Sequence, residues 1–160
     1  MKNLKYKICG INKQSNLPEI LLLQPDFIGH IFYPKSPRNF KLEELQEFQK
    51  IDYRDTQKDA VMVNPELSLV QNLAESYNFK FFQFHGEETV SFCEAVKRLN
   101  SEIQLIKVFA LGDHWDHLIL QPYLHCVDFF LFDTKSEQYG GSGQSFNWEL
   151  LNDYPYEVPY

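Results

Sequence analysis

Several short apolar runs in the sequence end in a side chain that can react or bind. Cys9 follows LKYKI, Asn64 follows DAVMV, His85 follows KFFQF and Asp133 follows VDFFLF. In folds built from parallel strands, reacting groups gather at the carboxyl ends of the strands. The recurrence therefore predicts an active site that combines a thiol, an imidazole and a carboxylic acid.

Cys9 and Asp133 are the candidates for moving protons. A cysteine acts as a general base or a nucleophile once its thiolate is favoured, whereas its alternative role is that of a small buried hydrophobe. An apolar environment favours the protonated form of a carboxyl group, which is the form that a general acid requires. The alternative for Asp133 is a turn or cap before Thr134.

The segment YPKSPRNF at 33–40 carries Lys35, Ser36 and Arg38. Arg38 could bind a carboxylate through two parallel N–H···O bonds, or it could be a solvated loop charge. His85 precedes GEE, so its alternative role is to cap a helix. The glycine-rich GGSG at 140–143 could present backbone N–H groups to a phosphate, or it could serve as a lid.

His114, Asp116 and His117 resemble a metal cluster around Trp115. They lie at an expected helix start and lack a further ligand, so we interpret them as a solvated helix terminus. No CxxC pair is present, which argues against a thiolate zinc site. We therefore expect no metal.

Composition limits the class of protein. The 160 residues are 44% hydrophobic and 16% aromatic, which excludes a mainly disordered chain. Net charge is −7 without a basic run, so we expect neither nucleic-acid nor membrane partners, and an anionic substrate would need a few local cations. The start lacks the apolar stretch of a secretory signal, and the three cysteines are widely spaced, which favours a reduced, cytoplasmic protein.

The elements that must position these residues alternate along the chain. We expect strands at 4–9, 26–33, 59–64, 80–85, 103–109 and 127–133, and helices at 16–23, 42–50, 66–77, 88–99, 113–123 and 146–154. Near-continuously apolar strands separated by helices indicate a parallel α/β sheet with helices on its faces. The first strand is followed by a segment with one glycine, which disfavours a doubly wound dinucleotide fold. We therefore expect a (β/α)₈ barrel.

The chain is too short for all eight βα units of such a barrel. Eight βα units need about 200 residues. We therefore expect 1–160 to be a single domain that is incomplete at its C-terminus, with EVPY at 157–160 opening a seventh strand. The first and sixth strands would then be exposed edges, and such edges recruit other chains, so we expect no stable, active monomer.

The motifs together resemble the phosphoribosylanthranilate isomerase family of tryptophan biosynthesis. The matching segments are KICGI at 7–11, DFIGHIFYPKSPR at 26–38, VMVN at 61–64, FQFHGEE at 82–88, LFDT at 131–134 and GGSGQSFNW at 140–148. They occur in the family's order and spacing. The resemblance implies a cytoplasmic barrel enzyme without a cofactor, as a monomer or a homodimer.

The resemblance also implies a reaction and a role for each residue. The reaction is the Amadori rearrangement of N-(5-phosphoribosyl)anthranilate to 1-(2-carboxyphenylamino)-1-deoxyribulose 5-phosphate. Asp133 would be the general acid and Cys9 the general base. Arg38 would orient the anthranilate carboxylate, with His85 in the same pocket. Gly141 and Gly143 would contribute to substrate binding.

Two features depart from the family. His30 stands where the family usually has an apolar or aromatic residue. The family also continues into two further strands, whose loops supply much of its phosphate site. The alternatives are therefore an inactive truncated fragment and a sugar-phosphate binding or assembly module that needs a partner chain.

Overall fold

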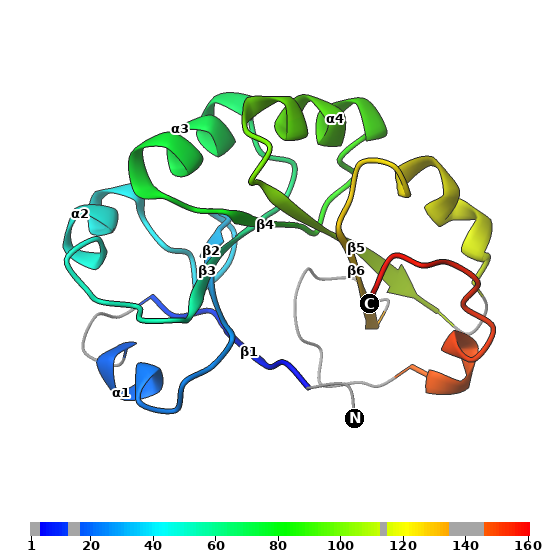
Figure 1. Cartoon of the computed structure of the whole chain (residues 1–160), viewed down its shortest axis with the longest axis horizontal. Coiled ribbons are helices and arrows are strands. Elements are labelled where there is room, and N and C mark those ends of the chain that lie inside the picture. The colour runs from blue at the N-terminus through cyan, green and yellow to red at the C-terminus, as the bar shows by residue number, and fades with distance from the viewer. Residues whose placement is uncertain (1–3, 13–16, 113–114, 135–145) are drawn as a thin grey trace.

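The computed structural model describes residues 4–12, 17–112, 115–134 and 146–160. Six strands form one sheet in the order β1-β2-β3-β4-β5-β6, and every pair is parallel. The strands are β1 (Lys7–Cys9), β2 (Phe27–Phe32), β3 (Gln57–Met62), β4 (Phe81–Phe84), β5 (Gln104–Leu111) and β6 (Phe129–Thr134). The sheet curls, and the helices lie on its convex side (Figure 1). The predicted parallel α/β architecture is confirmed.

Helices connect the strands on that convex side. They are α1 (Leu17–Leu21), α2 (Leu45–Phe48), α3 (Leu67–Tyr77) and α4 (Val90–Leu99), with the 3₁₀ helices η1 (Leu42–Glu44) and η2 (His117–Tyr123). A third 3₁₀ helix, η3 (Trp148–Leu151), follows β6. The helix expected at 66–77 is present as α3, and its apolar side faces the sheet, since Val70 and Leu73 are fully buried. Thr89 caps α4, because its side chain accepts the N–H of Phe92 at 3.2 Å.

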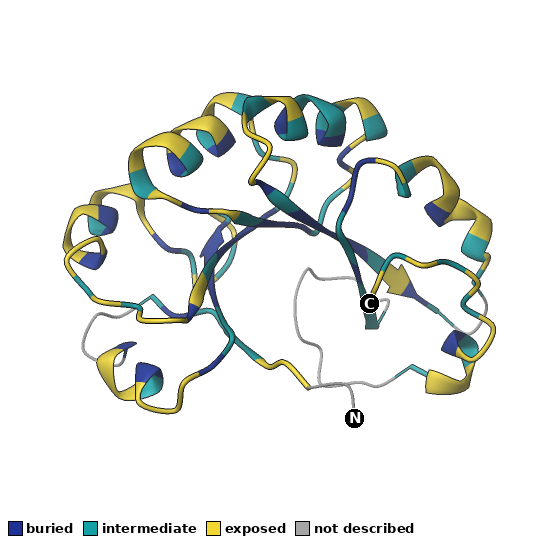
Figure 2. Cartoon of the chain, viewed as in Figure 1, coloured by how far each residue is buried: buried dark blue, intermediate teal, exposed yellow. Residues whose placement is uncertain are grey.

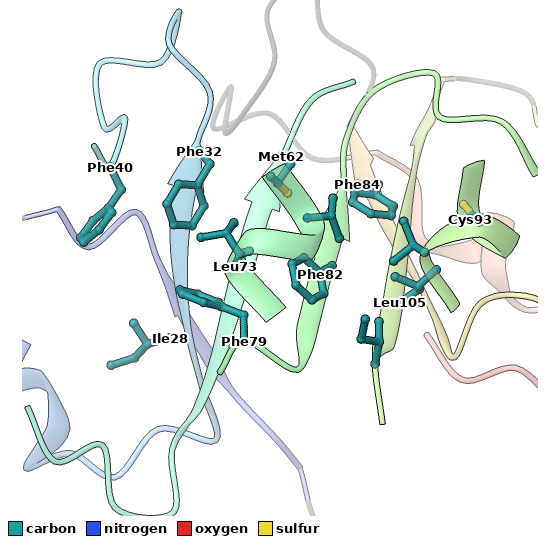
Figure 3. Close-up of a cluster of buried hydrophobic side chains, with 14 of the residues drawn as sticks. Ile28, Phe32, Phe40, Met62, Leu73, Phe79, Phe82, Phe84, Cys93 and Leu105 are labelled. Carbon is teal, nitrogen blue, oxygen red and sulfur yellow. The ribbon is translucent and has the colours of Figure 1, made fainter. Parts of the chain in front are cut away.

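The hydrophobic core lies between the sheet and these helices. Buried residues follow the strands and the inward faces of the helices, while the outer helix faces are exposed (Figure 2). Figure 3 shows Met62, Phe82, Phe84 and Leu105 of neighbouring strands packed with Leu73 of α3 and Cys93 of α4. Side chains alternate along a strand, so the residues between these point into the concave interior.

Four expected elements differ in the structure. The stretch expected as a helix at 113–123 forms 3₁₀ turns with Pro122 inside, since proline lacks the N–H that an α-helix needs. Segments 42–50 and 146–154 are likewise shorter or 3₁₀ in form. Residues 157–160 form no strand. Pro159 has no N–H for a ladder, and only its carbonyl pairs, with the N–H of Phe130 at 2.9 Å.

Among the described residues, β1 and β6 are the two edges of the sheet. The expectation that such edges recruit other chains stays a prediction. No helix in the described ranges is long and apolar enough to cross a membrane.

His30 replaces the apolar side chain expected at its position on β2 and is fully buried beneath the helices. Its Nδ1 lies 3.0 Å from the carbonyl oxygen of Ile11, and its Nε2 lies 3.1 Å from the hydroxyl of Tyr53. The ring packs edge-on or tilted against Phe40 and Phe48. Both ring nitrogens are therefore satisfied in a neutral imidazole, and burial lowers the pKa of His30 to about 4.

We predict that His30 makes the fold sensitive to acid. Its pKa falls from 6.5 when the chain is unfolded to about 4 when it is folded. The unfolded state therefore binds the proton first, and stability is lost as the pH falls from 6.5 through 4, by about 3 kcal/mol from this group. Urea titrations at pH 7, 5.5 and 4.5 measure the loss. His30→Gln should lose less than wild type over this range, and parallel profiles for the two proteins would contradict the prediction.

Candidate active site

A cavity of about 400 Å³ opens at the carboxyl ends of the strands, inside the curl of the sheet. It is lined by Lys7, Cys9, Ile31, Tyr33, Ser36, Arg38, Val61, Val63, Gln83, His85, Leu131 and Asp133. The structure thus brings together Cys9, Arg38, His85 and Asp133, which come from four different strand ends. Curvature is the reason, because in a flat sheet β1 and β6 would lie at opposite margins.

Cys9 is the last residue of β1 and lies on the concave face opposite Gly29 of β2. A Cβ on Gly29 would lie 2.7 Å from the Cys9 sulfur, so only glycine leaves room for the thiol at this point. Burial raises the pKa of the Cys9 thiol; Lys7 opposes this shift, Asp59 adds to it and Arg38 opposes it. Burial therefore has the largest effect on how readily the thiol ionises, and the charges around it modify that effect.

Arg38 reaches back from the loop after β2 to the end of β1. Its Nη1 donates to the carbonyl oxygen of Cys9 at 3.1 Å, and its own N–H donates to the Ser36 hydroxyl at 3.2 Å. Gly10 takes a φ of +89°, and a Cβ there would lie 2.8 Å from Arg38 Cδ. Glycine is thus needed at position 10, both because the backbone there has a positive φ and because a side chain would displace the Arg38 side chain.

His85 follows β4, and its ring is oriented by a neighbour that the sequence analysis missed. Gln83 Oε1 accepts from the Lys7 ammonium, so Gln83 Nε2 donates to His85 Nε2. This assigns the hydrogen of the imidazole to Nδ1. Burial, with a smaller contribution from Lys7, lowers the pKa of His85 to about 4, so the ring is neutral at pH 7. His85 therefore offers a polar but uncharged side to the cavity.

Asp133 lies in β6, beside Ala110 of β5, and borders the cavity. Its Oδ1 accepts the N–H of Thr134 at 2.8 Å. Thr134 belongs to the same strand, so this contact lies within β6 and is not a turn. Asp133 lines the cavity, and its role as a general acid stays a prediction.

The loops after β3 and β4 are held by a buried ion pair. Glu88 Oε2 lies 3.1 Å from Lys107 Nζ, and both side chains are at most 4% exposed. Glu88 Oε1 accepts the N–H groups of Asn64 and Gly86 at 2.8 and 3.1 Å. Lys107 also donates to the Gly86 carbonyl at 2.8 Å. This network ties down the turn that presents His85, and Asn64 serves in it rather than in the cavity lining.

The remaining candidates fall elsewhere. Gly141 and Gly143, expected to bind substrate, lie outside the described residues, as does His114. Asp116 caps η2, because its Oδ1 accepts the N–H of Leu118 at 2.8 Å. Within the described ranges, no group of three or more His, Cys, Asp or Glu side chains could hold a metal ion.

Sequence reasoning missed three polar residues of the concave interior, namely Lys7, Asp59 and Gln83. The alternation of side chains along a strand could have identified two of them, Lys7 and Gln83. Side chains two apart on a strand share a face, so Lys7 must accompany Cys9 and Gln83 must accompany His85. Asp59 was expected only to begin a strand, yet it lies two residues inside β3 and is fully buried.

Comparisons with known proteins agree on one family. A sequence model of N-(5'-phosphoribosyl)anthranilate (PRA) isomerase matches residues 6–159. The N-(5'-phosphoribosyl)anthranilate isomerase of Staphylococcus epidermidis is 36% identical over 145 residues, which cover 91% of this chain and 70% of that protein.

Solved structures agree on the fold. The phosphoribosyl anthranilate isomerase of Thermotoga maritima superposes with a TM-score of 0.77 at 28% identity, over 94% of this chain and 71% of that one. A second isomerase structure, in complex with reduced 1-(o-carboxyphenylamino)-1-deoxyribulose 5-phosphate, has a TM-score of 0.59 at 21% identity over 81% of this chain and 74% of that one. The predicted barrel fold class is confirmed.

We predict that Lys107→Met destabilises the protein by about 3–5 kcal/mol, because it leaves the Glu88 charge buried without its partner. The double variant Glu88→Gln/Lys107→Met should recover part of that loss. Urea unfolding measures both. Lys80→Met is the control, since the Lys80–Glu102 pair is exposed and should matter little. Equal effects of Lys107→Met and Lys80→Met would contradict the prediction.

Proposed function

The chain belongs to the N-(5'-phosphoribosyl)anthranilate isomerase family, and on that premise we propose that it catalyses the family's Amadori rearrangement in tryptophan biosynthesis. One observation supports this most: a thiol on the first strand and a carboxyl group on the sixth border the same 400 Å³ cavity. The rearrangement needs an acid and a base on different sides of one sugar, and the two strand ends supply that separation.

In the first step Asp133 acts as the general acid. Its carboxyl proton goes to the ring oxygen of the ribose while the bond from that oxygen to C1 breaks. The lone pair of the anthranilate nitrogen forms a double bond to C1, which gives an open-chain Schiff base. Asp133 is held for this by the strand pairing of β6 with β5 and by its contact with the Thr134 N–H.

In the second step Cys9 acts as the general base. Its thiolate takes the proton from C2, and the C–H electrons form a double bond to C1 while the nitrogen regains its lone pair. The resulting enol becomes the ketone when its hydroxyl proton leaves and a proton is added at C1. The substrate and the product are isomers, so no other reactant is consumed.

Arg38 and His85 bind the substrate in this proposal. The Arg38 guanidinium lies at the mouth of the cavity and is exposed, so it can pair with the anthranilate carboxylate. The neutral His85 offers its Nδ1–H to a hydroxyl or carboxylate oxygen without adding charge. Gly141 and Gly143 are proposed phosphate contacts on the sequence pattern alone.

The proposal extends to the setting of the enzyme. We place it in the cytoplasm, where this biosynthetic family acts, as a monomer or a homodimer that sedimentation would distinguish. Its substrate is a small phosphorylated molecule. Measuring isomerase turnover of the purified chain tests the function directly. Substrate binding without turnover would instead indicate a sugar-phosphate binding module.

We predict that Cys9→Ser and Asp133→Asn each lower kcat by roughly two orders of magnitude or more, as the loss of a general base or acid does. Serine is a far weaker base than a thiolate, and an amide cannot donate the required proton. Fluorescence assays of the substrate measure kcat, and thermal melts check folding. Cys126→Ala, which alters a thiol outside the cavity, is the control. Near-normal turnover of Cys9→Ser would remove Cys9 from the mechanism.

Arg38→Ala should mainly weaken substrate binding. Loss of a charge-assisted hydrogen bond costs about 1.5–3 kcal/mol, which is roughly a ten- to hundredfold rise in KM. Steady-state kinetics separates KM from kcat. Lys35→Ala removes a cation from the same loop but outside the cavity lining, so it should leave KM near the wild-type value. If the two variants behave alike, Arg38 does not bind the carboxylate.

A further inference from the structure

The concave interior holds an ion pair that the mechanism above does not use. Lys7 Nζ contacts Asp59 Oδ2, and the same ammonium donates to Gln83 Oε1. The Asp59 side chain is fully buried and that of Lys7 is 18% exposed. Lys7, Asp59 and Gln83 come from β1, β3 and β4, so the pair bridges the interior across β2. Burying two charges is costly unless they are matched in this way.

The ammonium of this pair is close to the Cys9 sulfur. Lys7 is two residues before Cys9, so both side chains leave β1 on the concave face. A Cβ placed on Gly29 would lie 2.7 Å from Cys9 Sγ and 2.9 Å from Lys7 Cε. The sulfur and the last carbon of the lysine are therefore within 5.6 Å of each other, the sum of 2.7 and 2.9 Å. The ammonium nitrogen is one bond beyond that carbon, and its charge opposes the rise that burial causes in the pKa of the Cys9 thiol.

Charged and titratable groups surround this thiol. Lys7 on β1, Arg38 after β2 and Asp59 on β3 act on it directly. Tyr33 after β2, His85 after β4 and Asp133 on β6 line the same cavity. Lys7 and Arg38 favour the thiolate, and Asp59 disfavours it. Burial raises the pKa of Asp59, and its ion pair with Lys7 opposes that shift. Asp59 Oδ2 pairs with the Lys7 ammonium, and among the described residues Asp59 Oδ1 has no hydrogen-bond partner.

We propose that Lys7 and Asp59 are positioning residues that set the charge state of Cys9: Lys7 promotes the thiolate, and Asp59 anchors Lys7 and partly cancels its charge. The inference rests on the proposed role of Cys9 in taking up a proton. A general base works best when its affinity for protons suits the working pH. A thiol buried without Lys7 would stay protonated. A thiolate beside an uncompensated lysine would form readily but would be a weaker base.

The two members of the pair therefore have opposite effects on Cys9, and this distinguishes the proposal from a merely structural role. Asp59→Asn should move the pH midpoint of Cys9 alkylation by iodoacetamide to lower pH and raise its rate at pH 7 by roughly threefold, because the gain in thiolate outweighs its lower nucleophilicity. Lys7→Met should move the midpoint to higher pH. Both variants should lower kcat. Mass spectrometry of the Cys9 peptide separates it from Cys93 and Cys126.

Glu102→Gln is the matched control, since it neutralises a carboxylate paired with a lysine on the surface, and it should leave the Cys9 profile unchanged. Midpoints that stay at the wild-type value, or that move in the same direction in both variants, would overturn the proposal. If Lys7→Met does not fold, the Asp59→Asn midpoint decides alone.

Alkylation needs no substrate, so this test separates the inference from the proposed function. Absence of turnover in the wild-type chain would defeat the proposed function while leaving the alkylation result intact, and full turnover of Cys9→Ser would remove Cys9 from the mechanism. Opposite midpoint shifts without an effect on turnover would show that the pair sets the ionisation of Cys9 but that catalysis does not use it, which would overturn the positioning role.

Discussion

The register of the parallel sheet is the constraint on which the rest of the structure depends. Cys9 pairs with Gly29, and Gly29 pairs with Asp59, so the thiol, a residue without a side chain and a carboxylate lie in one row across three strands. A shift of one residue would turn every side chain of a strand to the opposite face. It would place Lys7 and Cys9 among the aromatic rings under the helices and would turn apolar side chains toward the concave interior.

This register separates two polar networks on the two faces of the sheet. The concave network of Lys7, Asp59, Gln83 and His85 lies beside the reacting groups. The convex network of Glu88 and Lys107 lies under α4 and closes the turn that carries His85. Buried pairs of this kind stabilise little relative to apolar packing, but breaking one leaves a costly charge. Both networks therefore act as constraints on loop and side-chain position, and they converge on His85 from opposite sides.

The residues at the strand ends could be predicted from the sequence, but the ion pair of Lys7 and Asp59 beside them could not. Cys9, His85 and Asp133 could be placed together because apolar runs end at each of them and parallel strands share a carboxyl edge. The sequence predicts Asp59 as the polar start of a strand, because its ion-pair partner Lys7 lies 52 residues away and no nearby residue indicates the pairing. The prediction of a helix at 113–123 was wrong for a local reason. The spacing of apolar residues favoured an α-helix, but Pro122 lacks the N–H that an α-helix needs, and the segment forms a 3₁₀ helix.

The charges of the interior also explain how an acidic protein can accept an acidic substrate. The net charge of −7 disfavours anions at long range, but salt screens charges beyond about 8–10 Å at physiological ionic strength. Inside the cavity the nearby cations are Lys7 and Arg38, which face one carboxylate at Asp133 and one at Asp59 that is already paired. The proposed acid role of Asp133 requires its neutral form, and because Lys7 and Asp59 neutralise each other, Arg38 then gives the cavity a net positive charge. Selection of a carboxylate therefore depends on the local arrangement of these few groups, which in turn depends on the sheet register that sets them in place.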